Sequence, residues 1–161
     1  MGLFLALGLI LHWIESFFPP LLPLPGMRLG LANVVPLVLL LSGKTKEALC
    51  INLLRIFLGS FLGGNFLSIP FLMSLVGGFT SLIGMVLVHR RCSTPLWISV
   101  GGAFFHNLGQ WWVAFLWMRS ETFLWYLPVL LALSLPAGFL VGYLGILFRR
   151  EEKEVVWRHL R

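Results

Sequence analysis

The chain has 161 residues, of which 58% are hydrophobic and only 11% are charged, and its mean hydropathy is +0.92. A soluble domain carries about 25% charged residues, so this composition excludes an ordinary soluble protein and indicates an integral membrane protein. The formal net charge of +6 would suit a nucleic-acid partner only if the basic residues gathered on one soluble surface, and their positions indicate otherwise.

Prolines, glycines and clusters of charge divide the chain into six apolar runs joined by short connectors. About 20 apolar residues cross a membrane as one helix, so the length leaves room for six helices and no separate soluble domain. We therefore expect an all-α membrane protein, with one six-helix transmembrane domain over residues 1–148 and a short basic tail over 149–161. The runs lie near residues 3–18, 28–42, 46–64, 69–88, 95–118 and 124–148.

The basic residues give the expected orientation. Nine of the 12 Lys and Arg residues follow the second, fourth or sixth run, and the positive-inside rule makes this side the cytoplasm, with both termini there. The basic surplus is thus a topology signal, with contact to anionic membrane lipids as a second role, and no nucleic acid is expected as a partner. The nine residues are Lys44, Lys46, Arg90, Arg91, Arg149, Arg150, Lys153, Arg158 and Arg161.

The first two runs carry charge in the outer half of the membrane. Glu15 lies near the end of the first run, and Arg28 and Asn33 lie near the start of the second. The connector PPLLPLPGM between them has four prolines and no charge, which predicts a stiff, apolar outer loop. That loop is either a cap over a site or a plain rigid turn.

The later runs carry small and polar residues at a spacing of three and four, which places them on one face of each helix. Small residues let helix backbones approach closely, so most of these stripes indicate helix packing alone. Arg55 is different, because it falls near the middle of the third run. The stripes are Asn52, Arg55, Gly59 and Gly63; then Ser74, Gly77, Gly78, Ser81 and Gly84; and then Ser134, Gly138, Gly142 and Gly145.

The fifth run contains GGAFFHNLGQWW, in which His106, Asn107 and Gln110 share one helix face. These residues lie from the middle of the membrane outward. The adjacent Trp111 or Trp112 could stack on a ring of a bound molecule. Together with the charges of the first three runs, they form one polar layer between the membrane midplane and its outer surface.

A charged side chain at the centre of a membrane costs about 2.5–3.5 kcal/mol, so the polar layer must have a structural or functional role. Two interpretations of that role stay open. In the first, Glu15 neutralises Arg28 or Arg55, and the amides and the imidazole tie helices together. In the second, the layer lines an outward-facing pocket in which cations outnumber the one carboxylate, which suits an anionic or zwitterionic solute. The candidate substrate-binding residues are then Glu15, Arg28, Asn33, Arg55, His106, Asn107, Gln110 and Trp111.

Signs of catalysis are scarce. Cys50 and Cys92 lie 42 positions apart without metal-ligand spacing, and no P-loop motif is present. We therefore expect no catalytic residue, metal site or cofactor, and a protein that is not an enzyme. An autonomous ion channel is disfavoured, because no filter sequence repeats and no ring of charge is evident.

Five stretches of the chain resemble the bacterial Gx transporter family, also named heptaprenyl diphosphate synthase component I, over about residues 6–145. The most specific parts are PGMRLGLAN and HNLGQ. The transporter name implies similarity to the substrate-binding S components of energy-coupling factor (ECF) importers. These six-helix proteins of the bacterial cytoplasmic membrane bind a vitamin-like solute near the outer face. The stretches are ALGLILHWIES, PLPGMRLGLANVVPL, KEALCINLLRIFLGSFLGG, SLVGGFTSLIGM and GGAFFHNLGQWWVA.

This resemblance implies an importer subunit that captures a flavin-like, quinone-precursor-like or thiamine-like solute, with an ECF transmembrane subunit and ATPases as partners. The chain departs from many S components in helix one, where Ala6 is followed by Ile10 instead of a second alanine used for docking. The synthase name implies chemistry on isoprenoid diphosphates, for which paired aspartate-rich motifs hold Mg²⁺. The chain has no aspartate, so the alternative is a noncatalytic membrane subunit associated with heptaprenyl diphosphate synthase and quinone-isoprenoid metabolism.

Overall fold

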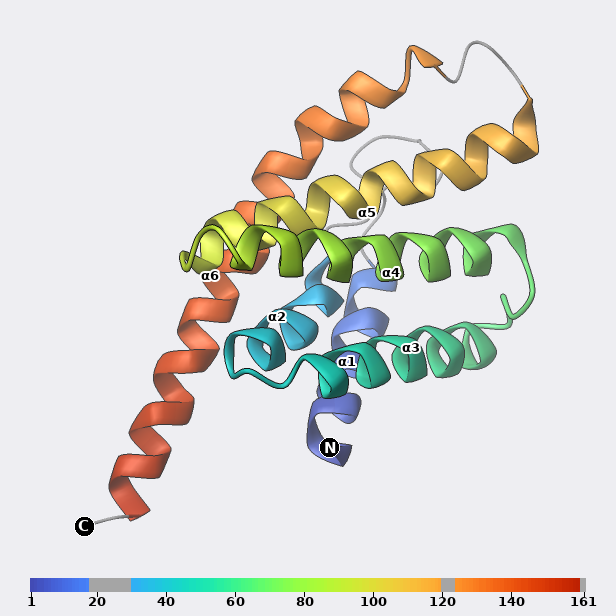
Figure 1. Ribbon diagram of the computed structural model, residues 1–161. Coiled ribbons are helices and arrows are strands. Elements are labelled where there is room, and N and C mark those ends of the chain that lie inside the picture. The colour runs from blue at the N-terminus through green and yellow to red at the C-terminus, as the bar shows by residue number, and fades with distance from the viewer. Residues whose placement is uncertain (18–29, 120–123, 160–161) are drawn as a thin grey trace.

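The computed structural model describes residues 1–17, 30–119 and 124–159, with the backbone alone for Ser16 and for 150–159. Every described element is helical, which confirms the all-α prediction (Figure 1). The elements are α1 (Gly2–Phe17), the short 3₁₀ helix η1 (Leu31–Asn33), α2 (Val34–Leu41), α3 (Thr45–Leu62), α4 (Ile69–His89), α5 (Pro95–Met118) and α6 (Leu127–His159).

Local sequence sets the helix boundaries. Ser68 caps α4, because its hydroxyl oxygen accepts a hydrogen bond of 3.4 Å from the Phe71 backbone N–H. Pro70 and Pro95 lie in the first turns of α4 and α5, where a missing N–H leaves no helix hydrogen bond unmade. Gly43 has a φ of +76°, a left-handed conformation that lets the chain leave α2 and turn into α3.

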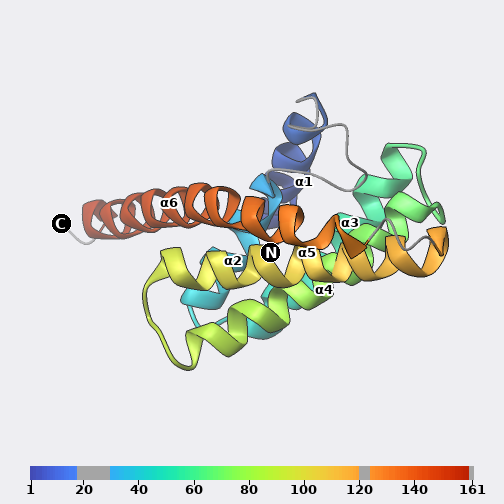
Figure 2. The same ribbon diagram turned by 90° about the horizontal axis from the view of Figure 1, so that it is seen from above.

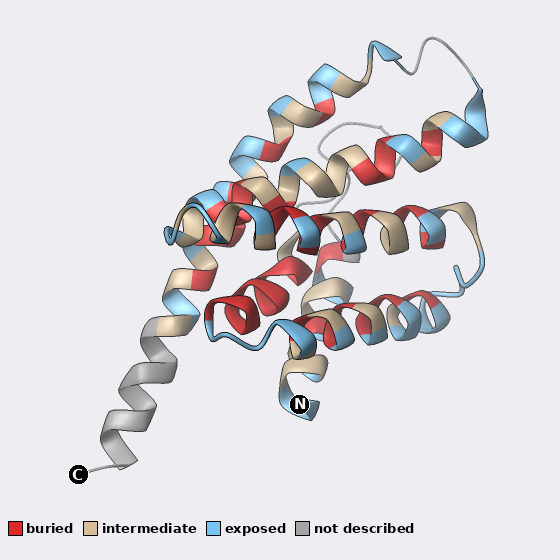
Figure 3. Ribbon diagram, viewed as in Figure 1, coloured by how far each residue is buried: buried red, intermediate tan, exposed pale blue. Residues whose placement is uncertain are grey.

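The second run differs most from its prediction over residues 28–42. Residues 28 and 29 lie outside the described part of the chain, Gly30 adopts a φ of +74°, and the run then forms η1 and an eight-residue α2. At 1.5 Å per residue, α2 is about 12 Å long, which is far less than the roughly 30 Å hydrocarbon core of a membrane. All eight of its residues are buried (Figure 3).

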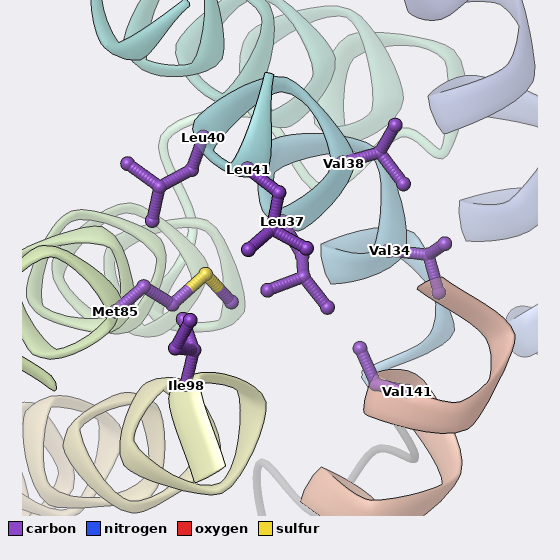
Figure 4. Close-up of a cluster of buried hydrophobic side chains, with 8 residues drawn as sticks. All are labelled: Val34, Leu37, Val38, Leu40, Leu41, Met85, Ile98 and Val141. Atoms are coloured by element: carbon purple, nitrogen blue, oxygen red, sulfur yellow. The ribbon is translucent and has the colours of Figure 1, made fainter. Parts of the chain in front are cut away.

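Helix α2 forms the core of the molecule because it is apolar on all sides and is therefore stable when it is covered on all sides. Leu37 is fully buried and packs in one cluster with Met85 of α4, Ile98 of α5 and Val141 of α6 (Figure 4). Arg149 of α6 donates a hydrogen bond of 2.9 Å to the carbonyl oxygen of Leu41, at the end of α2. A second cluster on the other side consists of Val35, Leu39, Ala48, Ile51 and Leu82.

The other helices surround α2. Helix α4 lies between α3 and α5, the first part of α6 lies along α5, and α1 crosses α3 (Figures 1 and 2). The small-residue stripes fit these interfaces: a Cβ added at Gly138 of α6 would come within 2.5 Å of the Val100 Cα on α5. At Gly142 the same atom would come within 2.8 Å of the Leu96 Cα. For the stripe of α6, the prediction that small residues bring helix backbones together is confirmed.

Two helices in the described part are long and apolar enough to cross a membrane, α4 and residues Leu127–Arg149 of α6. Helices α1 and α2 are shorter, and α3 contains three charged residues. Many large apolar side chains are exposed, as expected for a protein whose surface faces lipid. The side chains of Trp13, Phe61, Leu62 and Trp125 are 66%, 70%, 76% and 84% exposed. The backbone of α6 stays helical beyond residue 148, where the basic tail was expected to begin.

Candidate solute-binding site

Five of the eight predicted site residues surround one small cavity. The structure brings them from four elements: α1, η1, α3 and α5. The cavity has a volume of about 30 Å³, and a water molecule needs roughly 10–15 Å³ on this scale, so it fits water and not a solute. The five residues are Glu15, Asn33, Arg55, His106 and Gln110, and they are joined there by His12, Gly30, Ile56 and Ser74.

Arg55 is the centre of a hydrogen-bond network in this cavity. Its side chain is only 5% exposed, and its Nη2 donates to Asn33 Oδ1 at 3.3 Å and to Asn52 Oδ1 at 2.7 Å. Asn52 in turn donates through Nδ2 to the carbonyl oxygen of Gly78 at 2.9 Å. The network joins η1, α3 and α4, and it supplies the partners without which burying a cation would be very costly. The sequence assigns Asn52 only to the polar and small-residue stripe of the third run.

Glu15 links the end of α1 to the start of η1. Its side chain is 6% exposed, and its Oε1 accepts a hydrogen bond from the Gly30 backbone N–H. Glu15 and Arg55 line the same cavity, so groups of opposite charge share one buried space. Arg28 and the PPLLPLPGM connector lie outside the described residues, and the predicted neutralisation by Glu15 stays a prediction.

Several of these polar side chains fit because they lie over a glycine of an adjacent helix. A Cβ added at any of these glycines would meet the polar side chain at or inside van der Waals distance. The glycines on α1, α3 and α4 therefore make room for the cavity as well as for close helix packing. The pairs and Cβ distances are Gly8 with Arg55 Cδ at 3.3 Å, Gly59 with His12 Cδ2 at 2.8 Å, Gly77 with Gln110 Cγ at 2.8 Å and Gly78 with Asn52 Nδ2 at 3.1 Å.

The polar side chains of the HNLGQ stretch of α5 have two different surroundings. His106 and Gln110 line the cavity, whereas Asn107 donates through Nδ2 to the carbonyl oxygen of Leu130 on α6 at 2.8 Å. Asn107 therefore ties two helices together, as the first interpretation predicted. Trp111 is buried and stacks on Phe115, with ring centroids 5.2 Å apart, and it is not among the described residues that line the cavity.

A larger pocket of about 590 Å³ adjoins the polar cavity between α1, α3 and the start of α4. Its volume falls in the range of roughly 300–1,000 Å³ that small-molecule sites occupy. His12 and Ser74 line both spaces, so they form the boundary between them. The rest of the lining is mainly apolar, with Trp13 and Phe71 among its rings.

The sequence did not reveal this pocket. His12 lies one turn before Glu15, and Ser74 belongs to a small-residue stripe, but neither pattern indicates a hollow. The hollow depends on how α1 crosses α3, which residue spacing does not specify. Both spaces lie towards the ends of α1 and α3 and the start of α4, away from the basic connectors at Lys44 and Arg90.

Comparison with known proteins gives one match. A family model described as heptaprenyl diphosphate synthase component I matches residues 4–148. The matched region contains all of the residues that line the two spaces. No curated protein and no solved structure matches the chain.

Proposed function

We propose that this chain, which belongs to the heptaprenyl diphosphate synthase component I family, is a membrane-embedded subunit that captures a small anionic or zwitterionic solute. The observation that carries the proposal is the junction of the 590 Å³ pocket with the polar cavity around Arg55. The body of the solute occupies the larger pocket. Its charged group faces the boundary at His12 and Ser74, towards the buried guanidinium.

The proposed membrane topology follows from the positions of the basic residues. The connectors after α2 and α4 and the end of α6 hold the basic residues, so they and both termini face the cytoplasm. The two spaces then open in the outer half of the bacterial cytoplasmic membrane. One six-helix domain over residues 1–148 and a basic tail over 149–161 complete this arrangement.

ATP-driven transport would require partner subunits, because the sequence has no P-loop with which to use ATP. An S-component-like role supplies them as an ECF transmembrane subunit and its ATPases. Helix α1 supports such docking, since it presents an exposed apolar face at helical spacing to the surroundings. This face begins with Leu3 and Ala6 in the first half of the helix, before Ile10 and Trp13 of the same face reach the larger pocket.

The test begins with mass spectrometry of small molecules that copurify with the protein in lipid nanodiscs, followed by calorimetric titration of the identified solute. We expect His12→Ala and Ser74→Ala, at the boundary that the charged group faces, to weaken binding tenfold or more, about 1.5–3 kcal/mol, where a hydrogen bond to a charged group is lost. Asn107→Ala removes a polar side chain that is not among the described residues lining either space, so it is the control and should leave the affinity unchanged. Unchanged affinity in both test variants, in folded protein, would show that the site is misplaced.

The family description favours a second candidate, a noncatalytic membrane subunit associated with a heptaprenyl diphosphate synthase. The chain has no aspartate for the metal-binding motifs of prenyl elongation, so it would act by holding a catalytic partner at the membrane. The same purification distinguishes the two candidates. Copurification of a prenyl-elongating enzyme, with no small solute, would favour the synthase subunit.

A further inference from the structure

A third hollow lies near the opposite ends of the same helices, between the start of α3 and the second half of α4. Its volume is about 400 Å³, and its walls are almost wholly apolar. Phe79, Ile83 and Leu87 of α4 line it and are 49%, 42% and 47% exposed. Lys46, in the first turn of α3, and Arg90, which follows α4, line it as well.

Residues of α4 line this groove along its length. Phe79, Ile83, Leu87 and Arg90 follow one another at spacings of three and four, so they form one helix face. At 1.5 Å per residue this face is about 16 Å long, which is close to half of the roughly 30 Å hydrocarbon core of a membrane. The groove therefore has the length of a single lipid leaflet and carries its cations at one end.

The charges at that end are not balanced within the groove. Lys46 and Arg90 are both exposed, and no carboxylate is among the described residues that line it. A second protein helix would fill the apolar part but would need acidic residues at this end. A phospholipid supplies both parts in one molecule, since basic pockets between membrane helices bind anionic headgroups on the cytoplasmic side.

We propose that this groove binds one anionic phospholipid, with an acyl chain along Phe79, Ile83 and Leu87 and the phosphate between Lys46 and Arg90. The site shares no residue with the polar cavity or the larger pocket. It therefore does not depend on the proposed solute or on the importer role. It requires that the groove face lipid and that its basic end lie on the cytoplasmic side.

Neighbouring residues give matched controls for the test. Lys44 lies two residues before Lys46, and Arg91 directly follows Arg90. Both are also exposed and are not among the described residues that line the groove. Native mass spectrometry of the full chain measures binding of phosphatidylglycerol and of phosphatidylcholine with the same acyl chains. We expect wild-type protein to retain one phosphatidylglycerol molecule at least tenfold more tightly than phosphatidylcholine.

The variants distinguish a specific lipid site from a general attraction between basic residues and anionic lipid. Lys46→Gln with Arg90→Gln should weaken phosphatidylglycerol binding at least tenfold, whereas Lys44→Gln with Arg91→Gln should change it less than twofold. Ile83→Trp should also weaken binding with both cations present, and inorganic phosphate should not displace the lipid. Equal losses in the two double variants, equal binding of the two lipids, displacement by phosphate, or a protein chain retained in place of lipid would each overturn the proposal.

Discussion

Arg55 shows how a charge is placed in the interior of an apolar protein. Asn33 and Asn52 accept from its guanidinium, Asn52 also binds the Gly78 carbonyl, and Gly8 leaves space for the side-chain stem. Each partner comes from a different turn or helix, so the cation is satisfied only when these elements are assembled. Removing one partner should therefore cost more than replacing the whole network with apolar groups.

This asymmetry gives a prediction about Asn52. Asn52→Leu leaves the Gly78 carbonyl and the Arg55 guanidinium each short of one partner, so it should lower the free energy of unfolding by about 1–3 kcal/mol. Adding Arg55→Leu removes the buried charge and should recover part of that loss. Unfolding in mixed detergent micelles measures Asn52→Leu, Arg55→Leu and the double variant. A double variant that loses the sum of the two single losses would contradict this account.

Residue spacing predicted part of the site and missed the rest. Depth in the membrane placed Glu15, Asn33 and Arg55 at one level with His106 and Gln110, and the structure brings these five around one cavity. The polar face of α5 is wide enough to contact two neighbouring elements. Spacing alone therefore does not predict that Asn107 bonds to α6 while His106 and Gln110 line the cavity. His12 became part of the boundary only through the crossing of α1 over α3.

At the scale of helices, prolines and glycines made most boundaries predictable. The fifth run matches α5 from Pro95 to Met118, and the fourth differs from α4 by one residue at its end. The second run could not be predicted in the same way, because a continuous apolar sequence does not show where a short buried helix begins. The left-handed Gly30 and the packing of α2 against three other helices set its length.

The interface between α5 and α6 gives the prediction at this scale. At Gly138 the obstacle to a Cβ is the Val100 backbone, which cannot rotate away as a side chain can. Gly138→Ala should therefore push the helices apart and destabilise the protein by about 1–3 kcal/mol. Gly2→Ala, where nothing lies within 4 Å, is the control and should be neutral or slightly stabilising, because alanine favours a helix. Thermal unfolding compares the two, and equal effects would mean that α6 does not need this contact.

At the scale of the whole molecule, the two proposed binding sites lie at opposite ends of the helices. The polar cavity and its adjoining pocket lie towards the ends of α1 and α3, and the basic groove lies near the start of α3 and the end of α4, at Lys46 and Arg90. This separation is what an outward-facing solute site and a cytoplasmic lipid contact require together. Both proposals therefore depend on the orientation of the protein in the membrane.

Cys92, in the connector between α4 and α5, is a native probe of that orientation. The proposed topology places it in the cytoplasm, so a membrane-impermeant maleimide should label it in inverted vesicles and not in intact cells. Cys50→Ser removes the other thiol and leaves a single reporter. Labelling of Cys92 from outside intact cells would reverse the topology and with it the outward-facing solute site.

The rate of this labelling should also depend on pH in a defined way. Hydrogen bonds from Thr94, first from its backbone and then from its side chain, lower the pKa of Cys92 below the ordinary value of 9.0. The thiolate is the reactive form, so the rate should fall with decreasing pH around a midpoint below 9.0. Thr94→Val removes only the side-chain bond and should raise the midpoint part of the way back. A midpoint at or above that of a free thiol, unchanged in Thr94→Val, would show that the connector does not hold these two residues together.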